Sequence, residues 1–258
     1  MESSESFLRF QNRAADYAAG RPTYPAVLFD YLFSRLTLGV GAEVADVGSG
    51  TGIFTRCLLE RGLRVTALEP SDDMRLTAES LLGGYPGFSS VNGTASATGL
   101  ATASVRIIFC AQAFHWFNEA PTLHEWRRIL RPGGTAVLIW NYQDTTSGFV
   151  ADYLDAVRDG GPDASKTLAA SWNTHIDNVL FRSGEAETVA FPHEHRLDFD
   201  GLLLRTSSTS YLPRQGDPRF ADLAARLRVV FDRHQSGGKV TFAYRTVAVF
   251  GPLDSGRP

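Results

Sequence analysis

Short apolar runs alternate along the first half of the chain with segments in which apolar residues recur every three or four positions. The runs have the length and composition of buried strands, and they lie at residues 44–47, 63–68, 88–92, 105–111 and 135–140. Segments with helical spacing lie beside them, at residues 26–36, 53–61, 72–82 and 120–130, with a turn at 131–134. This alternation predicts a doubly wound, mainly parallel sheet of the α/β class.

The alternation weakens after residue 141, although the pattern still predicts both kinds of element. Helices are expected at residues 149–158, 168–181, 199–211 and 221–233, and strands at 189–196 and 240–250. Residues 7–20 are expected to form an amphipathic helix. We therefore expect three parts: an N-terminal helical arm and cap (1–36), a cofactor-binding α/β core (37–141), and remaining sheet strands with substrate-lid helices (142–258).

Composition narrows the class of protein further. The 258 residues are 43% hydrophobic, which is enough for a sizeable core, and the net charge is -3. This charge argues against nucleic acid or an anionic membrane as a partner, and no apolar stretch is long enough to span a bilayer. The polar, acidic start is unlike a signal peptide, and Cys57 and Cys110 are expected to be reduced and buried. We expect a cytoplasmic protein, either a monomer or a homodimer.

The most informative segment is the glycine-rich turn Asp46–Gly52, which follows the first predicted strand and precedes a predicted helix. A dinucleotide site has the spacing G-x-G-x-x-G, whereas this turn reads D-x-G-x-G-x-G. An acid at this point would repel a pyrophosphate but would attract a cationic amine. The turn therefore indicates a ligand that carries an ammonium group, and not NAD.

The second predicted strand ends in Glu69-Pro70-Ser71. An acid about twenty residues beyond a glycine turn is placed to accept hydrogen bonds from ribose hydroxyls. Ser71 is expected to cap the next helix. Met74 follows where an apolar side chain either lies on an adenine ring or belongs to the core.

Several blocks together resemble one family of enzymes. They are Tyr17 with Arg21-Pro22-Thr23-Tyr24-Pro25, Asp46–Gly52, Glu69-Pro70-Ser71, Gln112-Ala113-Phe114-His115-Trp116-Phe117 and Leu130-Arg131-Pro132-Gly133-Gly134. In this order they resemble class I methyltransferases of the small-molecule type that use S-adenosyl-L-methionine (SAM), and within them the trans-aconitate methyltransferase-like group. The resemblance implies a Rossmann-like, seven-stranded sheet with a reversed last strand and a helical lid. It also implies S-adenosyl-L-homocysteine (SAH) as a product.

The resemblance implies which residues bind the cofactor: Tyr17, Arg21, Asp46, Gly48, Ser49, Gly50, Glu69, Pro70, Met74, Thr94, Ala95 and Gln112. Asp46 would lie near the ammonium group, and Glu69 would hold the ribose. The loop after the third strand departs from the family pattern, because relatives often carry an acid there and this chain has only Asn92, Thr94 and Ser96. The fourth strand also lacks the usual acid at its start. These differences indicate an altered adenine contact.

The loop after the fourth strand is the expected place of methyl transfer, because strand ends of such sheets face the ligand. His115 is the candidate general base, since histidine titrates near neutral pH; the alternative is a wall residue that only shapes the site. The expected substrate pocket consists of Tyr24, His115, Trp116 and Trp140. Arg21 is expected to bind a carboxylate of SAM or of the acceptor, or to be a solvated loop residue. Tyr17 either closes over the cofactor or packs as an ordinary helix residue.

Two further segments carry chemistry. His193 and His195 would share one face of a strand, which invites a metal site, but no cysteine or acid cluster completes it and we predict no metal. The polar stretch 207–211 is flanked by Arg205 and Arg214. It either faces an anionic acceptor or is a poor helix end with surface charges.

The predicted function is transfer of a methyl group from SAM to a small organic acceptor. Oxygen is the first choice of acceptor atom, with nitrogen and carbon as alternatives. A second hypothesis is a cyclase or another natural-product enzyme on the same fold that transfers no methyl group. A third is a non-catalytic binding partner, against which the intact Asp46–Gly52 turn and Glu69 argue.

Overall fold

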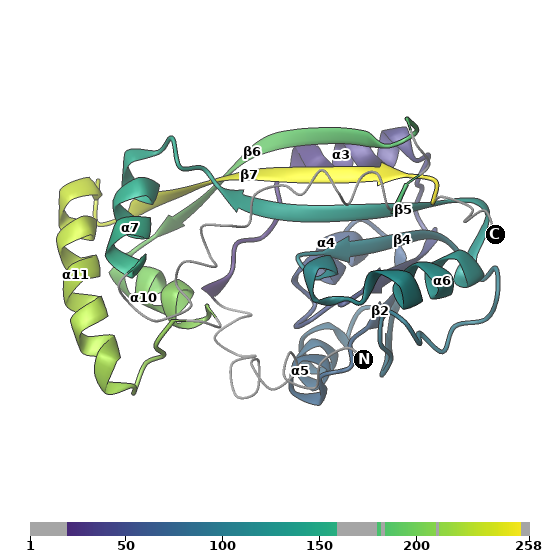
Figure 1. Ribbon diagram of the computed structural model, residues 1–258, viewed down its shortest axis with the longest axis horizontal. Coiled ribbons are helices and arrows are strands. Elements are labelled where there is room, and N and C mark those ends of the chain that lie inside the picture. The colour runs from purple at the N-terminus through teal and green to yellow at the C-terminus, as the bar shows by residue number, and fades with distance from the viewer. Residues whose placement is uncertain (1–19, 159–179, 182–183, 210–211, 254–258) are drawn as a thin grey trace.

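The computed structural model describes residues 20–158, 180–181, 184–209 and 212–253. Its centre is one seven-stranded sheet with the order β3-β2-β1-β4-β5-β7-β6 (Figure 1). The strands are β1 (Glu43–Val47), β2 (Arg64–Leu68), β3 (Phe88–Val91), β4 (Val105–Ala111), β5 (Leu130–Gln143), β6 (Glu187–Leu197) and β7 (Val240–Gly251). β1 to β5 pair in parallel, and β7 runs antiparallel to both β5 and β6. The expected sheet with a reversed last strand is thereby confirmed.

The described helices follow the strands as the apolar spacing predicts. They are α3 (Ala26–Arg35), α4 (Ile53–Leu59), α5 (Asp72–Leu82), η1 (Phe114–Trp116, a 3-10 turn), α6 (Glu119–Ile129), α7 (Gly148–Arg158), α10 (Phe199–Ser207) and α11 (Pro218–His234). Asp198 and Asp217 cap α10 and α11 by accepting hydrogen bonds from the backbone N–H groups of Gly201 and Arg219. Ser71 precedes α5 as expected, but its side chain makes no capping hydrogen bond.

The two faces of the sheet bury different side chains because strand residues alternate in direction. On one face, Ile107 and Phe109 of β4 join a cluster that includes Phe29 of α3 and Phe54 of α4. On the other face, the cluster includes Trp126 of α6. Cys57 and Cys110 are free thiols and buried, as expected.

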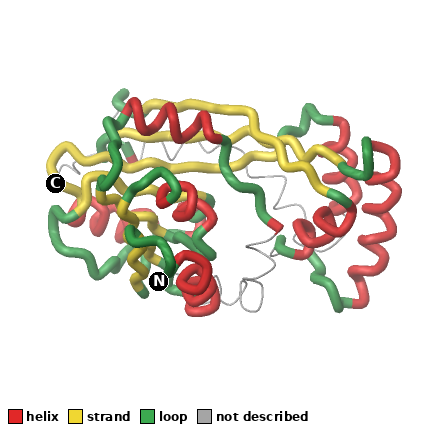
Figure 2. The backbone as a smooth tube through the Cα atoms, turned by 180° about the vertical axis from the view of Figure 1, so that it is seen from behind, coloured by secondary structure: helices red, strands yellow, loops and turns green. Residues whose placement is uncertain are grey.

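A third apolar cluster lies at the far ends of β6 and β7, where α7, α10 and α11 pack together, away from α4, α5 and α6 (Figure 1). The view from behind shows the same separation (Figure 2). Phe242 of β7 is fully buried there, stacked on Tyr244 at a ring-centroid distance of 5.0 Å. These helices are the part of the chain that the sequence predicts as a lid.

Some predictions differ from the structure or lie outside the described residues. Residues 131–134, expected as a turn, belong to β5, which shows a register shift against β4 and continues to Gln143 to match the long β7. This strand crosses the predicted boundary at residues 141/142; the three-part division stays a prediction. The helix expected at 7–20 lies outside the described residues except Gly20, and the helix expected at 168–181 lies outside except Leu180 and Phe181.

In the part of the chain that the structure describes, no helix has the length and apolar character needed to cross a bilayer. The same residues contain no group of three or more histidine, cysteine, aspartate or glutamate side chains arranged to hold a metal ion.

Candidate cofactor and acceptor site

The glycine-rich turn joins β1 to α4 through three residues with left-handed backbone conformations. Gly48, Gly50 and Gly52 have φ angles of 73°, 56° and 82°, which non-glycine residues rarely adopt. The backbone N–H groups of Gly48 and Ser49 donate to the carbonyl oxygen of Leu68, at 2.9 and 3.0 Å. The turn is thereby fixed against the end of β2.

The three glycines differ in what surrounds them. A Cβ atom at Gly48 would lie 2.6 Å from the Cβ of Ala113, and one at Gly52 would lie 2.5 Å from a methyl group of Leu82. A Cβ atom at Gly50 would meet nothing within 4 Å. Gly48 and Gly52 therefore serve close packing, whereas Gly50 leaves the backbone open to a ligand.

Buried polar atoms without partners gather at this turn. Asp46 is fully buried, and its Oδ2 accepts a 2.6 Å hydrogen bond from the Thr55 hydroxyl. Its Oδ1, the Ser49 hydroxyl and the Thr51 hydroxyl are buried and have no hydrogen-bond partner. Burial raises the pKa of Asp46 to about 7, although the Thr55 bond acts in the opposite direction. An unsatisfied buried group costs about 1–3 kcal/mol, so this turn gains from a polar ligand.

Glu69 reaches from the end of β2 to the glycine turn. Its Oε2 accepts from the Gly50 N–H at 3.0 Å, and its Oε1 accepts from the Ser71 N–H at 2.9 Å. The structure thus brings Asp46, Gly50 and Glu69 together, as the sequence predicts. Pro70 beside them is half-buried, and Met74 has only 4% of its surface exposed, which fits the core alternative.

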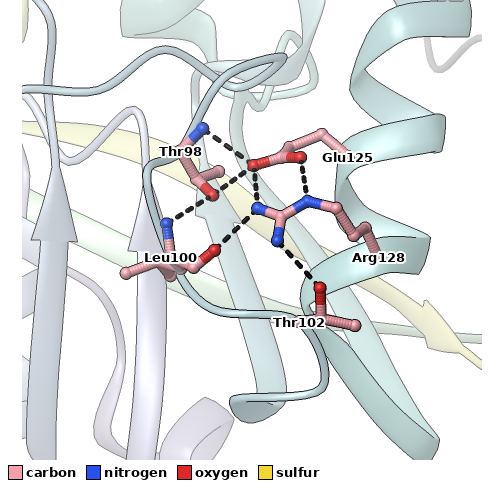
Figure 3. Close-up of polar contacts among 5 residues, drawn as sticks. All are labelled: Thr98, Leu100, Thr102, Glu125 and Arg128. Carbon is pink, nitrogen blue, oxygen red and sulfur yellow. Dashed lines mark hydrogen bonds and ion pairs between the residues drawn. The ribbon is translucent and has the colours of Figure 1, made fainter.

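The loop after β3 is held by a charged cluster in α6 (Figure 3). The Glu125 carboxylate accepts from both the N–H and the hydroxyl of Thr98, at 2.9 and 2.5 Å, and pairs with Arg128 at 2.7 Å. Arg128 also donates to the carbonyl oxygen of Leu100 at 2.7 Å. These bonds lower the pKa of Glu125 to about 2, with Arg128 as the largest cause. The cluster stabilises the loop that carries Thr94 and Ala95.

Within that loop the predicted adenine neighbours are placed as follows. Ala95 is 3% exposed and packs against the core, and the Thr94 hydroxyl lies 3.3 Å from that of Ser96. Thr94 forms a β-bridge with Ala97, which makes the loop compact.

The loop after β4 begins with a strained residue. Gln112 has a φ angle of 60°, uncommon for a side chain with a Cβ atom, and its N–H donates to the carbonyl oxygen of Ile139 at 2.8 Å. Such strained backbone positions cluster at functional sites. Phe114 anchors the next turn by packing on Trp126.

His115 follows on η1, with its ring centroid 4.8 Å from that of Trp116. The residue keeps contact with solvent, while the surrounding protein removes enough water to lower its pKa to about 4. This direction runs against the expectation that His115 titrates near neutral pH, and its role as a base or a wall residue stays a prediction. Its imidazole is neutral at pH 7, and such a group is a weak general base.

The other predicted pocket residues lie on opposite faces of the sheet. Tyr24 packs edge-on against Phe54 at a centroid distance of 5.0 Å, on the α3 and α4 face. Trp140 belongs to the cluster on the α6 face. Arg21 donates from Nη2 to the carbonyl oxygen of Ser208 at 3.2 Å, and therefore contacts the end of α10. Tyr17 lies outside the described residues.

Sequence reasoning missed the Thr55 bond to Asp46, the Glu125 cluster and the surroundings of Arg205. The spacing of Glu125 and Arg128 by three positions in a predicted helix was the available signal for that pair. No local pattern connects Arg205 with Tyr153 and Tyr244, because those residues lie far apart along the chain.

Comparisons with known proteins agree with this fold. Residues 45–138 match the family model described as a methyltransferase domain. An uncharacterized methyltransferase of Mycobacterium tuberculosis is 36% identical over 60% of this chain, which covers 61% of that relative's length. An uncharacterized methyltransferase-like protein of Schizosaccharomyces pombe is 26% identical over 93% of both chains.

Solved structures show the same architecture. A putative type II methyltransferase from Anaeromyxobacter dehalogenans has a TM-score of 0.65 and 23% identity, over 90% of this chain and 97% of that one. A putative methyltransferase from an antibiotic biosynthesis pathway of Anabaena variabilis has a TM-score of 0.62 and 21% identity, over 90% and 98%. Residues 45–138 are thus similar to a methyltransferase domain, and the chain shares the Rossmann-like fold of these solved structures.

Proposed function

We propose that this protein transfers the methyl group of SAM to a small organic acceptor, at an oxygen atom in the first instance and otherwise at nitrogen or carbon. The observation that carries the proposal is the glycine turn. There the open backbone at Gly50 lies beside Glu69, and the buried Asp46 keeps an oxygen without a partner.

The residues present fit SAM. Asp46 offers a carboxylate oxygen to an ammonium group, and attraction to that charge would favour its ionised form. Glu69 accepts from the backbone N–H groups of Gly50 and Ser71, and a carboxylate is also a suitable acceptor for ribose hydroxyls. A methyltransferase of Haemonchus contortus that was solved with SAH has a TM-score of 0.53 and 14% identity to this chain, and its fold supports the same cofactor.

SAM, when bound, would supply a methyl group on a cationic sulfur: the acceptor atom bonds to the methyl carbon as the carbon–sulfur bond breaks, and SAH leaves. The chain would orient the acceptor and exclude water, and such positioning alone supplies much of the rate in displacement reactions. The lowered pKa of His115 favours a neutral imidazole at pH 7, and the residue is exposed to solvent. Its two candidate roles are to accept a proton from the acceptor or to form part of the wall of the acceptor site. Its low pKa favours the wall role, which also suits its contact with Trp116.

Calorimetric titration with SAM and with SAH tests the cofactor. We expect micromolar binding of both to the wild type, and at least tenfold weaker binding to Gly50→Ala. Gly41→Ala is the matched control. Gly41 also has a left-handed φ, 81°, and open space around it, so the backbone strain is equal, but it lies before β1. Absence of binding to folded wild type would sink the methyltransferase proposal.

The cyclase alternative is separated by product mass. Incubation with SAM and candidate acceptors should give a product one methyl group heavier, together with SAH. A product of unchanged mass, formed without SAH, would favour the alternative. The trans-aconitate methyltransferase-like group, suggested by the motifs, directs the first screen to carboxylic acids.

A further inference from the structure

We propose that His193, His195 and Arg205, where α10 packs on β6 and β7, form a subsite that binds a carboxylate group of the methyl acceptor. The inference rests on the proposed function, because that function identifies the ligand as a methyl acceptor. The anion binding that the inference requires is a separate property and can be measured without methyl transfer.

Arg205 is held in a fixed orientation inside the protein. Only 2% of its surface is exposed, its Nε donates to the Tyr244 hydroxyl at 2.7 Å, and its Nη1 donates to the Tyr153 hydroxyl at 2.9 Å. The guanidinium carbon lies 3.8 Å from the ring centre of Phe242. A guanidinium fixed in this way places a permanent positive charge at this end of the sheet, which attracts an anion.

The two histidines present unsatisfied nitrogen atoms to the same place. His193 and His195 lie opposite Tyr244 and Phe242 in the β6–β7 register, so all four side chains share one face of the sheet. His193 bonds to the backbone of Thr23. The Nε2 of His193 and the Nδ1 of His195 are buried and have no hydrogen-bond partner. Each unsatisfied atom costs stability, which a ligand oxygen would restore.

The electrostatic field at this place favours a negative charge. The pKa of His195 is lowered mainly by burial, next by the charge of Arg205, and least by His193. The charges of Arg205 and Arg21 also act to lower the pKa of Tyr244, against the larger effect of burial. An approaching carboxylate would reverse the effect on the histidines, because a nearby negative charge stabilises imidazolium. The same field would repel a metal cation.

The segment before α3 connects this subsite with the cofactor side. Arg21 bonds to Ser208 after α10, and the Thr23 carbonyl oxygen accepts from Asn141 of β5 at 3.1 Å. Tyr24 then packs on Phe54, in the first turn of the helix that follows the glycine turn. An acceptor held at His193 and His195 would therefore lie beside the segment 21–24, which runs from the end of α10 to the helix after the glycine turn.

Binding of succinate to SAH-saturated protein tests the subsite, with succinamide as the neutral analogue and inorganic phosphate as a second oxyanion. The readout is the NMR signal of the histidine Cε1–H groups, assigned by His193→Asn and His195→Asn. We expect saturable succinate binding that moves both signals toward the imidazolium position, and no effect of succinamide. His195→Asn should weaken succinate binding at least tenfold, as should Arg205→Met if that variant folds.

Arg196→Gln is the matched control, because Arg196 lies on the same strand with its side chain exposed on the opposite face. Its succinate affinity should stay within about twofold of the wild type, since exposed charges are screened. Equal weakening by Arg196→Gln, or no shift with succinate, would overturn the inference. Binding of phosphate but not of succinate would overturn the carboxylate proposal and would show that the subsite recognises a phosphate group. SAH affinity is measured on the wild type and on every variant: no SAH binding to the folded wild type marks failure of the cofactor proposal, whereas variants that keep SAH binding test the subsite alone.

Discussion

The glycine turn and the α10 end of the sheet both hold polar atoms that await a partner, but they are built differently. The turn is local: Asp46, Gly50 and Glu69 come from one strand-turn-helix unit and the next strand. The other site joins His193, Arg205 and Tyr153 from three distant elements. The contrast teaches that one short motif is enough to bring Asp46, Gly50 and Glu69 together, whereas the surroundings of Arg205 depend on how α7 and α10 pack on β7.

The largest effect is expected where the turn is most tightly packed. Gly48→Ala would place a Cβ atom 2.6 Å from Ala113 and 2.9 Å from Phe117. Left-handed strain of about 1–2 kcal/mol and overpacking of about 1–3 kcal/mol should both lower the free energy of unfolding. Urea unfolding of Gly48→Ala measures the sum of strain and overpacking. Gly41→Ala introduces backbone strain without overpacking and therefore measures the strain alone. Equal losses in the two variants would show that the turn relaxes away from Ala113.

A smaller loss is expected from the cluster that fixes the loop after β3. Glu125→Gln removes the charge that holds Arg128 and Thr98, and should cost about 1–3 kcal/mol of unfolding free energy. Glu79→Gln, which removes a more exposed pair with Arg75, should cost less than about 1 kcal/mol.

The pH dependence sharpens this prediction. The folded pKa of Glu125 is about 2, below the unfolded value, so its contribution is present above about pH 4.5 and is lost as the pH falls toward 2. Urea unfolding between pH 3 and 7 should therefore show the wild type and Glu125→Gln converging at low pH. A constant difference would mean that the carboxylate charge is not what holds the loop.

The local and the distributed site also differ in how far the sequence predicts them. Apolar spacing predicts β1 to β4 and α4 closely, because each has a single period and clear ends. It fails at residues 131–134, where Pro132 and Gly133 indicate a turn, whereas the structure includes these residues in β5 at an irregularity between the pairs Val105–Leu130 and Ile107–Thr135. It places Arg205 near polar residues but does not show its burial, since Tyr153 and Tyr244 reach it only through tertiary packing.

An effect of intermediate size is expected on the SAH affinity of variants at Asp46. It distinguishes the charge of this side chain from its size. The Asp46 pKa of about 7 means that the carboxylate ionises as the pH rises from about 6 to 8. If the cofactor ammonium requires that charge, SAH affinity should rise over this range by up to about tenfold per pH unit. Asp46→Asn keeps the size of the side chain and should bind weakly at all these pH values. Equal pH dependence in wild type and variant would assign the effect to another group.

The same residue has a consequence for stability in the absence of ligand. Because the folded pKa is raised, the folded state holds a proton that the unfolded state has lost between about pH 4 and 7. The free energy of unfolding should therefore fall as the pH rises through this range, and Asp46→Asn should flatten that fall. SAH at saturating concentration should offset it, since binding favours the folded state.

The smallest effect is expected at His115, on the 3-10 turn η1 that follows β4. Its pKa of about 4 predicts that the Cε1–H signal of His115, assigned with His115→Gln, remains at the neutral position down to about pH 5. His115→Gln should change SAH affinity by less than about twofold, because a neutral wall residue makes no charged contact with the cofactor. A signal that titrates near pH 6.5 would instead restore the general-base role. In that case the solvent to which His115 is exposed would have to be excluded when the acceptor binds, so that the proton passes to the imidazole and not to bulk water.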